Sequence, residues 1–390
     1  MVLRDKCIDE SMEPNNTMIE SRRDDSVTPP TVSVIMACLN EEDFIEACLR
    51  SILAQKRPPG GFEVIVADGM SDDGTRGMLK RLTEQHSPKL IRMIDNPGRI
   101  VSTGLNTAIK TAKGKIIVRM DAHTEYASDY IQQCVSILQE TKADNVGGPW
   151  LAKGTGFISS AIAAAFQSPF AVGGARGHDA GYEGIVDTVY LGCWPRQVFD
   201  QIGFFDEELV RNQDDEFNLR LTRAGGKIWQ SPRIRSWYRP RGSLNTLFRQ
   251  YVQYGYWKVP LIQKHKIPAS PRHLVPACFV LSLFTLPLMA LWWPPALSVW
   301  LVLLSTYSAS NLVASVITAA GKQHVFLPLL PVVFTCYHIA YGYGFLRGIC
   351  DFIIFRCKPS LGRTRLTRIS KRLIGPDPGE TGGRNVRPVR

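Results

Sequence analysis

The chain is 390 residues long and 45% hydrophobic, which is enough apolar material for one large or two medium-sized domains. This size excludes a small domain that depends on disulfide bonds or a metal ion for its stability. Its 46 Lys and Arg residues against 35 Asp and Glu residues give a formal charge of +11, which suits anionic partners such as membrane lipids, nucleic acid or sugar nucleotides. The sequence has no internal repeat, which excludes a solenoid. Its nine cysteines form no CxxC pair, and its first residues lack the apolar core of a signal peptide. We therefore expect a reducing, cytosolic location for the N-terminal domain.

The N-terminal part of the chain alternates between β-rich and amphipathic stretches. Residues 1–30 are too poor in apolar residues to fold alone, and we expect a disordered polar tail there. Strands are then predicted at 31–40, 62–69, 90–97 and 115–123, and helices at 44–55, 74–86 and 100–113. This alternation predicts an α/β fold with a mostly parallel sheet and helices on both faces.

Polar residues gather where the predicted strands end. Asn40 and Glu41 follow the first strand, Asp68 ends the second, and Asp121 and His123 end the fourth. In an open parallel sheet the ligand crevice lies beyond the carboxyl ends of the strands. We therefore expect these side chains to line a binding crevice.

The stretch "MDAHTEY", residues 120–126, offers three candidate metal ligands. Asp121, His123 and Glu125 alternate along the chain, and alternate residues of an extended strand point to one side. Together they could hold a divalent ion that binds a diphosphate. The alternative is a strand-end turn in which Asp121 caps the following helix.

The passage "QDDEFNLRL", residues 213–221, places acidic residues at the start of a predicted helix. Asp214 could be a general base that takes a proton from a hydroxyl group. The helix dipole also favours acidic residues in a first turn, so simple stabilisation of the helix predicts the same pattern.

A basic and aromatic stretch at residues 225–258 precedes the apolar C-terminal part. Cations interleaved with aromatic rings can hold phosphates, stack on sugars or bind single-stranded nucleic acid. Because an apolar segment follows, a lipid headgroup or lipid diphosphate fits best, with Arg249, Gln250 and Trp257 as the acceptor or lipid-phosphate contacts. An aromatic belt at the membrane interface is the alternative.

The apolar segment that follows is long enough for more than one membrane pass. Residues 274–320 contain no Lys, Arg, Asp or Glu, and only "WWPP" at 292–295 interrupts the run. One spanning helix needs roughly 20 residues, so two passes around a Trp-Pro turn are predicted.

A further apolar segment lies at residues 325–346. Its Pro328 and Pro331 leave two possibilities, a third crossing or an interfacial or re-entrant segment. We therefore expect two or three membrane segments within 274–349. A basic tail at 350–390 follows, and positive charge of this kind favours the cytoplasm.

Four motifs in order are more specific than any one of them. They are "VSVIMACLNEE" from residue 32, "VIVADGMSDDGT" from 64, "NTAIKTAKGKIIVRMDAH" from 106 and "QDDEFNLRL" from 213. In this combination the chain resembles glycosyltransferase family 2 over residues 31–258, and the membrane segments make it most similar to the succinoglycan glucosyltransferases of that family. The resemblance implies an inverting enzyme with a Rossmann-like GT-A fold, followed by C-terminal transmembrane helices. Residues 31–130 would bind the nucleotide sugar. Residues 131–258 would bind the acceptor and hold the catalytic base.

The resemblance also implies roles for individual residues. Asp68 would hold the uracil ring and Glu41 would help to bind the nucleoside. Asp121 and His123 match the DxD motif that positions the sugar nucleotide and its Mg or Mn ion, and Glu125 stands where some relatives place another ligand. Asp214 matches the catalytic base.

Three departures from the family pattern qualify these expectations. His123 replaces the usual second Asp, which could shift the metal preference towards manganese or weaken metal dependence. Leu39 stands where many relatives have a Tyr, so one stacking contact with uracil is missing. "QYVQY" at 250–254 lacks the Arg and Trp of the QxxRW motif of processive synthases, which disfavours a polymerase.

The sequence thus predicts an enzyme that moves a hexose, by resemblance glucose, from a UDP-sugar to a sugar on a polyprenyl diphosphate, with formation of a β-glycosidic bond in exopolysaccharide assembly. It would be a multi-pass protein of the inner (plasma) membrane with its catalytic domain in the cytoplasm, in contact with membrane lipids and without a nucleic-acid partner. The alternatives are transfer to polyprenyl phosphate itself, which makes a lipid monophosphosugar, and a catalytically silent membrane scaffold.

Overall fold

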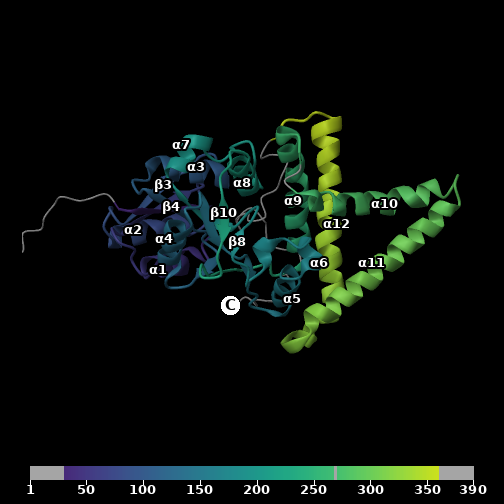
Figure 1. Cartoon of the computed structure of the whole chain (residues 1–390). Coiled ribbons are helices and arrows are strands. Elements are labelled where there is room, and N and C mark those ends of the chain that lie inside the picture. Colours follow the sequence, from purple (N-terminus) through teal and green to yellow (C-terminus); the bar gives the residue numbers. More distant parts are fainter. Residues whose placement is uncertain (1–29, 268–269, 360–390) are drawn as a thin grey trace, which may run out of the picture.

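The computed structural model describes residues 30–267 and 270–359, which form an α/β domain followed by a group of long helices (Figure 1). Two of the predicted segments, the N-terminal and C-terminal tails, lie largely outside these residues. Residues 1–29 of the predicted polar tail and residues 360–390 of the basic tail lie outside the described residues.

The α/β domain is built on an eight-stranded sheet in the order β3-β2-β1-β4-β9-β6-β10-β8. Its strands are β1 (Val32–Cys38), β2 (Phe62–Asp68), β3 (Ile91–Asp95), β4 (Ile116–Arg119), β6 (Asn145–Gly148), β8 (Gly184–Ile185), β9 (Tyr190–Pro195) and β10 (Ile228–Gln230). The four strands predicted from the sequence are β1 to β4, and they run parallel, as expected. Because β9 runs antiparallel to β4 and β6, the whole sheet is mixed.

Helices cover both faces of this sheet, as the alternating pattern predicted. One face carries α1 (Ile45–Leu53), α2 (Thr75–Gln85) and α4 (Tyr130–Thr141), and the other carries α3 (Val101–Thr111), α7 (Gln197–Ile202) and α8 (Gln213–Arg223). Within β1, Val34 and Met36 join the first core and Ile35 joins the second. Apart from Ser33 the strand is apolar, because both of its faces are buried.

A second, three-stranded sheet stands beside the first. Its strands are β5 (Thr124–Tyr126), β11 (Ser236–Tyr238) and β7 (Leu151–Ala152), in the order β5-β11-β7. β5 follows β4 after only four residues, so residues 120–123 connect the two sheets.

The remaining elements are helical. They are α5 (Phe157–Phe166), α6 (Pro169–Val172), α9 (Leu244–His265), α10 (Val275–Met289), α11 (Pro295–Ala319) and α12 (Leu330–Gly348), with 3-10 turns at Arg176–His178, Pro271–His273 and Gly321–Phe326 and a π-helical segment at Ile349–Ile354. Figure 1 shows α12 upright beside α9, whereas α10 and α11 reach away from the rest of the protein and form a hairpin.

Glycines allow α9 and α12 to cross closely. A Cβ atom at Gly255 of α9 would overlap the carbonyl oxygen of Tyr341, and one at Gly344 of α12 would overlap that of Val252. Since every other residue carries a Cβ atom, only glycine permits this approach of the two backbones. The crossing fixes α12 against α9.

Among residues 30–267 and 270–359, two helical segments are long and apolar enough to cross a membrane, Pro271–Met289 and Pro295–Ala319, each with a mean hydropathy of 1.5. Only 11% of the first and 17% of the second is buried within the protein, so their apolar side chains face outward. The third predicted segment forms α12, which instead packs against α9 and α10.

Candidate active site

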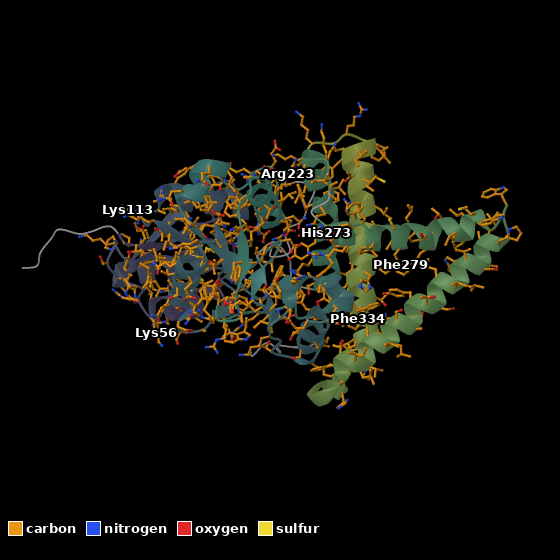
Figure 2. All side chains as sticks on the ribbon, in the orientation of Figure 1. Lys56, Lys113, Arg223, His273, Phe279 and Phe334 are labelled. Atoms are coloured by element: carbon orange, nitrogen blue, oxygen red, sulfur yellow. The ribbon has the colours of Figure 1, made fainter. Side chains whose placement is uncertain are left out.

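The carboxyl ends of β1 and β4 border a cavity of about 470 Å³ between the α/β domain and the helices. Its wall includes Glu41 and Asp121 from the strand ends, Asp214 from α8, and Tyr341 from α12. His273, at the start of the first apolar span, also lines it, and Figure 2 shows this residue at the boundary between the domain and the helices. The cavity therefore runs from the predicted crevice to the foot of α10.

The chain turns sooner after β4 than the sequence pattern predicted. β4 ends at Arg119, and residues 121–123 lie in a turn in which the Thr124 amide donates to the Asp121 carbonyl oxygen at 3.3 Å. Asp121, His123 and Glu125 therefore do not form one extended strand. The alternation rule that would place all three on one side does not apply across a turn.

Glu125 is held elsewhere by two cations. Its carboxylate pairs with Arg239 at 2.7 Å and with Lys153 at 2.9 Å. The hydrogen bonds from Lys153 and Arg239 hold the pKa of Glu125 below its usual range. Throughout residues 30–267 and 270–359, no three His, Cys, Asp or Glu side chains come close enough to hold a metal ion.

Arg119, the last residue of β4, connects two carboxylates of the cavity. Its Nε and Nη2 donate to the two oxygens of Asp121 at 3.1 and 3.2 Å, and its Nη1 lies 3.7 Å from Asp214 Oδ2. Burial lowers the pKa of Arg119, but Asp121 and Asp214 outweigh this effect and raise it, so the guanidinium stays charged. Nη1 is buried and makes no hydrogen bond within the protein.

Asp214 lies in the first turn of α8, which begins directly after Asn212, and the φ of 61° at Asn212 is left-handed. Burial raises the pKa of Asp214 above its usual value, and Arg119 opposes the increase. The next residue, Asp215, also lines the cavity and forms an ion pair with Lys258 of α9. The two adjacent acids therefore have different surroundings, and Asp214 is the one beside Arg119.

His123 is a neutral group in this site. Burial lowers its pKa to about 4, and the nearby Arg241, Arg119 and Arg211 act in the same direction. Its Nδ1 is buried, lies 3.5 Å from Glu41 Oε1 and makes no hydrogen bond. A neutral imidazole nitrogen without a hydrogen bond is able to bind a ligand or a metal ion.

Residues 33–169, which contain β1 from its second residue, β4 and the Asp121 turn, match the family model for glycosyl transferase family 2. The chain is similar to this family over those residues. It is a glycosyltransferase, because relatives that align over 84% and 82% of the chain carry this activity or serve polysaccharide synthesis.

Two relatives match this glycosyltransferase over most of their own length. The succinoglycan biosynthesis protein ExoA of Rhizobium meliloti is 29% identical over 330 residues, which are 84% of this chain and 98% of that protein. A dolichyl N-acetyl-α-D-glucosaminyl phosphate 3-β-D-2,3-diacetamido-2,3-dideoxy-β-D-glucuronosyltransferase of Methanococcus voltae is 26% identical over 324 residues, which are 82% of this chain and 97% of that protein.

A solved structure shares the fold. The mannosyltransferase PcManGT of Pyrobaculum calidifontis, in complex with GDP-Man and Mn²⁺, superimposes with a TM-score of 0.51 at 19% identity, over 80% of this chain and 87% of that one. The likeness shows the GT-A fold, with helices on both faces of its sheet, as the sequence predicted.

The residues at the strand ends fit a divalent ion shared with a substrate, but not one held by the protein alone. Mg²⁺ is usually bound by one or two carboxylates together with substrate phosphates. Asp121 offers such a carboxylate, and the buried, unbonded Nδ1 of His123 offers a second ligand. Glu125 is already paired with Arg239 and Lys153, so it does not belong to the proposed metal ligands.

The predicted nucleoside contacts lie in different surroundings. Glu41 lines the cavity, whereas Asp68 at the end of β2 does not. The fully buried Asp68 accepts hydrogen bonds from the Ser71 amide at 3.1 Å, the Ser71 hydroxyl at 2.5 Å and Arg76 at 2.6 Å. Its role towards uracil stays a prediction.

The predicted acceptor contacts of α9 separate in the same way. Gln250 is buried and lines the cavity, Arg249 is exposed and lies outside it, and Trp257 is fully buried in a core cluster. Sequence reasoning also left out Arg119 and Arg211, which line the cavity. A single arginine within the apolar run "IIVRM" was the available signal for Arg119, since an unpaired charge is costly inside a sheet.

Two thiols lie beneath the strand ends. Cys38 Sγ is 3.8 Å from Asp68 Oδ1, and Cys48 Sγ is 3.5 Å from the Asp121 carbonyl oxygen. Both side chains are buried; Cys38 belongs to the cavity wall, whereas Cys48 does not line the cavity.

Proposed function

We propose that this glycosyltransferase moves a hexose, most simply glucose, from a UDP-sugar to a sugar carried on a polyprenyl diphosphate, with inversion to a β-glycoside, in exopolysaccharide assembly. One observation supports it above the others. A single cavity joins the strand-end residues Asp121 and His123 and the acid Asp214 to the foot of a helix that is apolar enough to enter a membrane. A lipid-linked acceptor and a soluble donor could meet in such a cavity.

Asp214 is the proposed general base. It would take the proton from the attacking acceptor hydroxyl, whose oxygen then displaces the nucleoside diphosphate from the anomeric carbon in one in-line step. A single displacement inverts the configuration, so an α-linked donor gives a β-linked product. The carboxylate must be ionised for this role, and the neighbouring charge of Arg119 favours the ionised form.

Asp121, His123 and Glu41 form the proposed donor end. A Mg or Mn ion held by Asp121 and His123 would neutralise charge on the diphosphate and so make it a better leaving group. Arg119 holds the Asp121 carboxylate through two hydrogen bonds, which orients it towards the cavity before any donor binds.

The proposed acceptor class draws on the relatives and on the helices. ExoA is named for succinoglycan biosynthesis, and the Methanococcus enzyme for a dolichyl phosphate-linked sugar acceptor. Segments Pro271–Met289 and Pro295–Ala319 would cross the inner (plasma) membrane, with the α/β domain in the cytoplasm. Enzyme and lipid acceptor would then diffuse in one plane.

The experiment that tests this proposal is UDP release by purified membranes that contain the protein. A panel of UDP-sugars is supplied with Mg or Mn, with and without a polyprenyl-diphosphate-linked sugar, and the Asp214→Asn variant is the control. We expect release that depends on both the acceptor and one donor, and that falls by about 10²–10⁴ in the variant. Normal turnover by Asp214→Asn would contradict the base assignment.

The same assay separates the alternative functions. Transfer to polyprenyl phosphate without an attached sugar would yield a lipid monophosphosugar, which mass spectrometry of the lipid fraction identifies. Nucleotide binding without release from any donor would favour a silent scaffold.

A further inference from the structure

Both ends of the α10–α11 hairpin pack against segments that border the cavity. His273, at the start of the first apolar span, lines the cavity itself. Ala319, the last residue of α11, is buried in a core cluster with Ile162 of α5 and Leu247 of α9. Figure 1 shows that the two helices between these ends reach away from the sheet. The chain has therefore returned to the side of the α/β domain when α12 begins.

α12 then runs beside α9 and does not leave the protein again. The glycine contacts that join the two helices continue to Gly348, where a Cβ atom would lie 2.8 Å from the Tyr256 carbonyl oxygen. α9 carries the exposed Arg249 and also Lys258, which pairs with Asp215 of α8. Charged side chains are costly in the hydrocarbon of a bilayer, so α9 stays outside it. A third crossing by α12 would carry α9 into the hydrocarbon with it.

One face of α12 nevertheless stays exposed among the residues that the structure describes. Val332 and Tyr343 are 51% and 48% exposed, and Cys350 is exposed as well. Three helical turns separate the first two residues and two turns separate the last two, so all three share one face. Ile354 and Phe355, which are 63% and 70% exposed, extend this exposed stripe past the end of the helix. A contiguous apolar surface of this kind marks a site of contact with a partner or a membrane.

The surroundings of the exposed stripe identify its partner as a lipid surface. α10 crosses α12 at Gly342, where a Cβ atom would overlap the Pro276 carbonyl oxygen, so the first apolar span leaves the protein beside the stripe. The exposed Arg347 and Arg356 flank its C-terminal part. Apolar and aromatic side chains with arginines beside them are typical of a helix that lies in the membrane–water interface and contacts anionic lipids.

The far end of the hairpin marks the opposite surface of the bilayer. Trp292 and Trp293, between α10 and α11, are 82% and 51% exposed, and tryptophan is enriched at membrane–water interfaces. The span Pro271–Met289 has 19 residues, which cover about 28 Å as a helix. This length is close to the roughly 30 Å of a hydrocarbon core. With the two tryptophans at one interface, α12 therefore falls at the other.

We propose that α12 lies in the plane of the membrane–water interface, with the exposed stripe at the boundary between the headgroups and the acyl chains of an anionic bilayer. α10 and α11 are then the two crossings, and the chain beyond Phe355 lies on the side of the α/β domain. Because α9 lies against α12 and lines the cavity, this arrangement holds the site at the depth of the lipid headgroups. The inference rests on the membrane that the proposed function requires, but not on sugar transfer itself.

The first test measures the depth of α12 with spin labels on the full-length protein. Native Cys350, Val332→Cys and Tyr343→Cys each supply one label site, and Ile185→Cys is the matched control because Ile185 is an exposed residue of β8, 56% exposed, in the α/β domain. The buried cysteines stay, and serine replaces the others outside the label site, namely Cys7, Cys278, Cys336, Cys350 and Cys357. The protein is placed in vesicles of phosphatidylethanolamine and phosphatidylglycerol. Electron paramagnetic resonance with oxygen and a water-soluble nickel chelate then gives the depth of each label.

The depth profile along the helix decides between the possible positions of α12. In the interface, all three labels lie at one depth, about 5–10 Å into the boundary of headgroups and acyl chains. A crossing helix would place the Tyr343→Cys label deepest, roughly 15 Å from either surface, with the other two labels nearer to opposite surfaces. A helix without membrane contact would leave all three labels as accessible to the nickel chelate as the Ile185→Cys control. Either of these last two results would overturn the proposal.

The second test locates the end of the chain. Green fluorescent protein or alkaline phosphatase is fused to the C-terminus of the full-length protein, and the same reporters at the N-terminus identify the compartment of the α/β domain. We expect both ends to report the same compartment, whereas opposite compartments would show a third crossing. Neither test involves turnover. If sugar transfer is absent but the depth profile is flat, the proposed function fails and this inference stands.

Discussion

The two sides of the cavity are built in different ways. On the sheet side, hydrogen-bonded strand ends position Asp121 and Arg119, and the carboxylates there have cations as partners. On the helix side, α9 and α12 pack through glycine contacts, and the arginines of the wall are oriented by neutral glutamines. The sheet-side carboxylates pair with cations, whereas the partners of the two helix-side arginines, Arg211 and Arg241, include glutamine side chains.

One buried ion pair joins the two sides, and its removal should have the largest effect. Lys258 of α9 pairs with Asp215 of α8, and the lysine side chain is only 4% exposed. Lys258→Met leaves the carboxylate without its partner, so we expect a loss of about 2–3 kcal/mol in the free energy of unfolding. Thermal unfolding in detergent measures it.

Two controls accompany this variant. The double variant Lys258→Met with Asp215→Asn should recover much of the lost stability, since it leaves no unpaired charge. Arg233→Met breaks an exposed pair with Glu140 and should change the melting temperature little. Equal losses from Arg233→Met and Lys258→Met would contradict the special role of the buried pair.

The helix side alone is tested by a single methyl group. Gly344→Ala places a Cβ atom against the Val252 carbonyl oxygen, so the α9 and α12 backbones must separate, at a cost of about 1–3 kcal/mol. Gly77→Ala is the matched control, because its Cβ would meet nothing closer than 3.8 Å and alanine is the better helix former. If both substitutions stabilise the protein against unfolding, the crossing of α9 and α12 has room for the extra methyl group, and the prediction is wrong.

The sheet side alone is tested by the pH dependence of transfer. Burial raises the pKa of Asp214 above its usual value, and a base must be ionised, so activity should fall as the pH drops through this raised pKa. Arg119 lowers that pKa, and Arg119→Gln should therefore shift the acid limb of kcat/KM to higher pH. Arg119→Lys keeps the charge and should shift the limb less. If the acid limb of kcat/KM stays unchanged in Arg119→Gln, the ionisation of Asp214 does not set that limb.

The smallest expected effect concerns the metal ion. His123→Ala removes one of two proposed ligands, so the Mg or Mn concentration for half-maximal activity should rise several-fold while Asp121 still contributes. Binding of Mn²⁺ followed by electron paramagnetic resonance gives a second readout in the absence of turnover. Glu125→Gln is the matched comparison and should leave both values unchanged, because Glu125 faces Arg239 and Lys153.

Periodicity predicted the part of the fold that depends on local pattern. The strands β1 to β4 and the helices between them follow from continuous apolar runs alternating with amphipathic ones, and the placement of Asp214 in the first turn of α8 follows from its acidic cluster. Hydropathy likewise predicted the two exposed apolar helices, α10 and α11.

The rest of the site depends on contacts between distant segments. The early end of β4 at Arg119 separates Glu125 from Asp121, and no periodicity encodes where a strand stops. Trp257 and Gln250 looked equivalent on α9, but the packing of α12 buries one in a core and leaves the other at the cavity. The partners of Arg211 and Arg241 are likewise set by tertiary structure.

The distribution of thiols gives the protein its own chemical labels. Buried cysteines belong to the α/β domain, namely Cys38, Cys48, Cys134 and Cys193, whereas Cys278 on α10 and Cys350 after α12 are exposed. Burial raises the pKa of Cys48 to about 12, so its reactive thiolate scarcely forms. A water-soluble maleimide should therefore spare the thiols beneath the site. In membranes, we expect Cys278 to be protected from that reagent. After transfer to a thin detergent shell, we expect it to be modified. The difference would measure the depth of α10 in the membrane without any engineered cysteine.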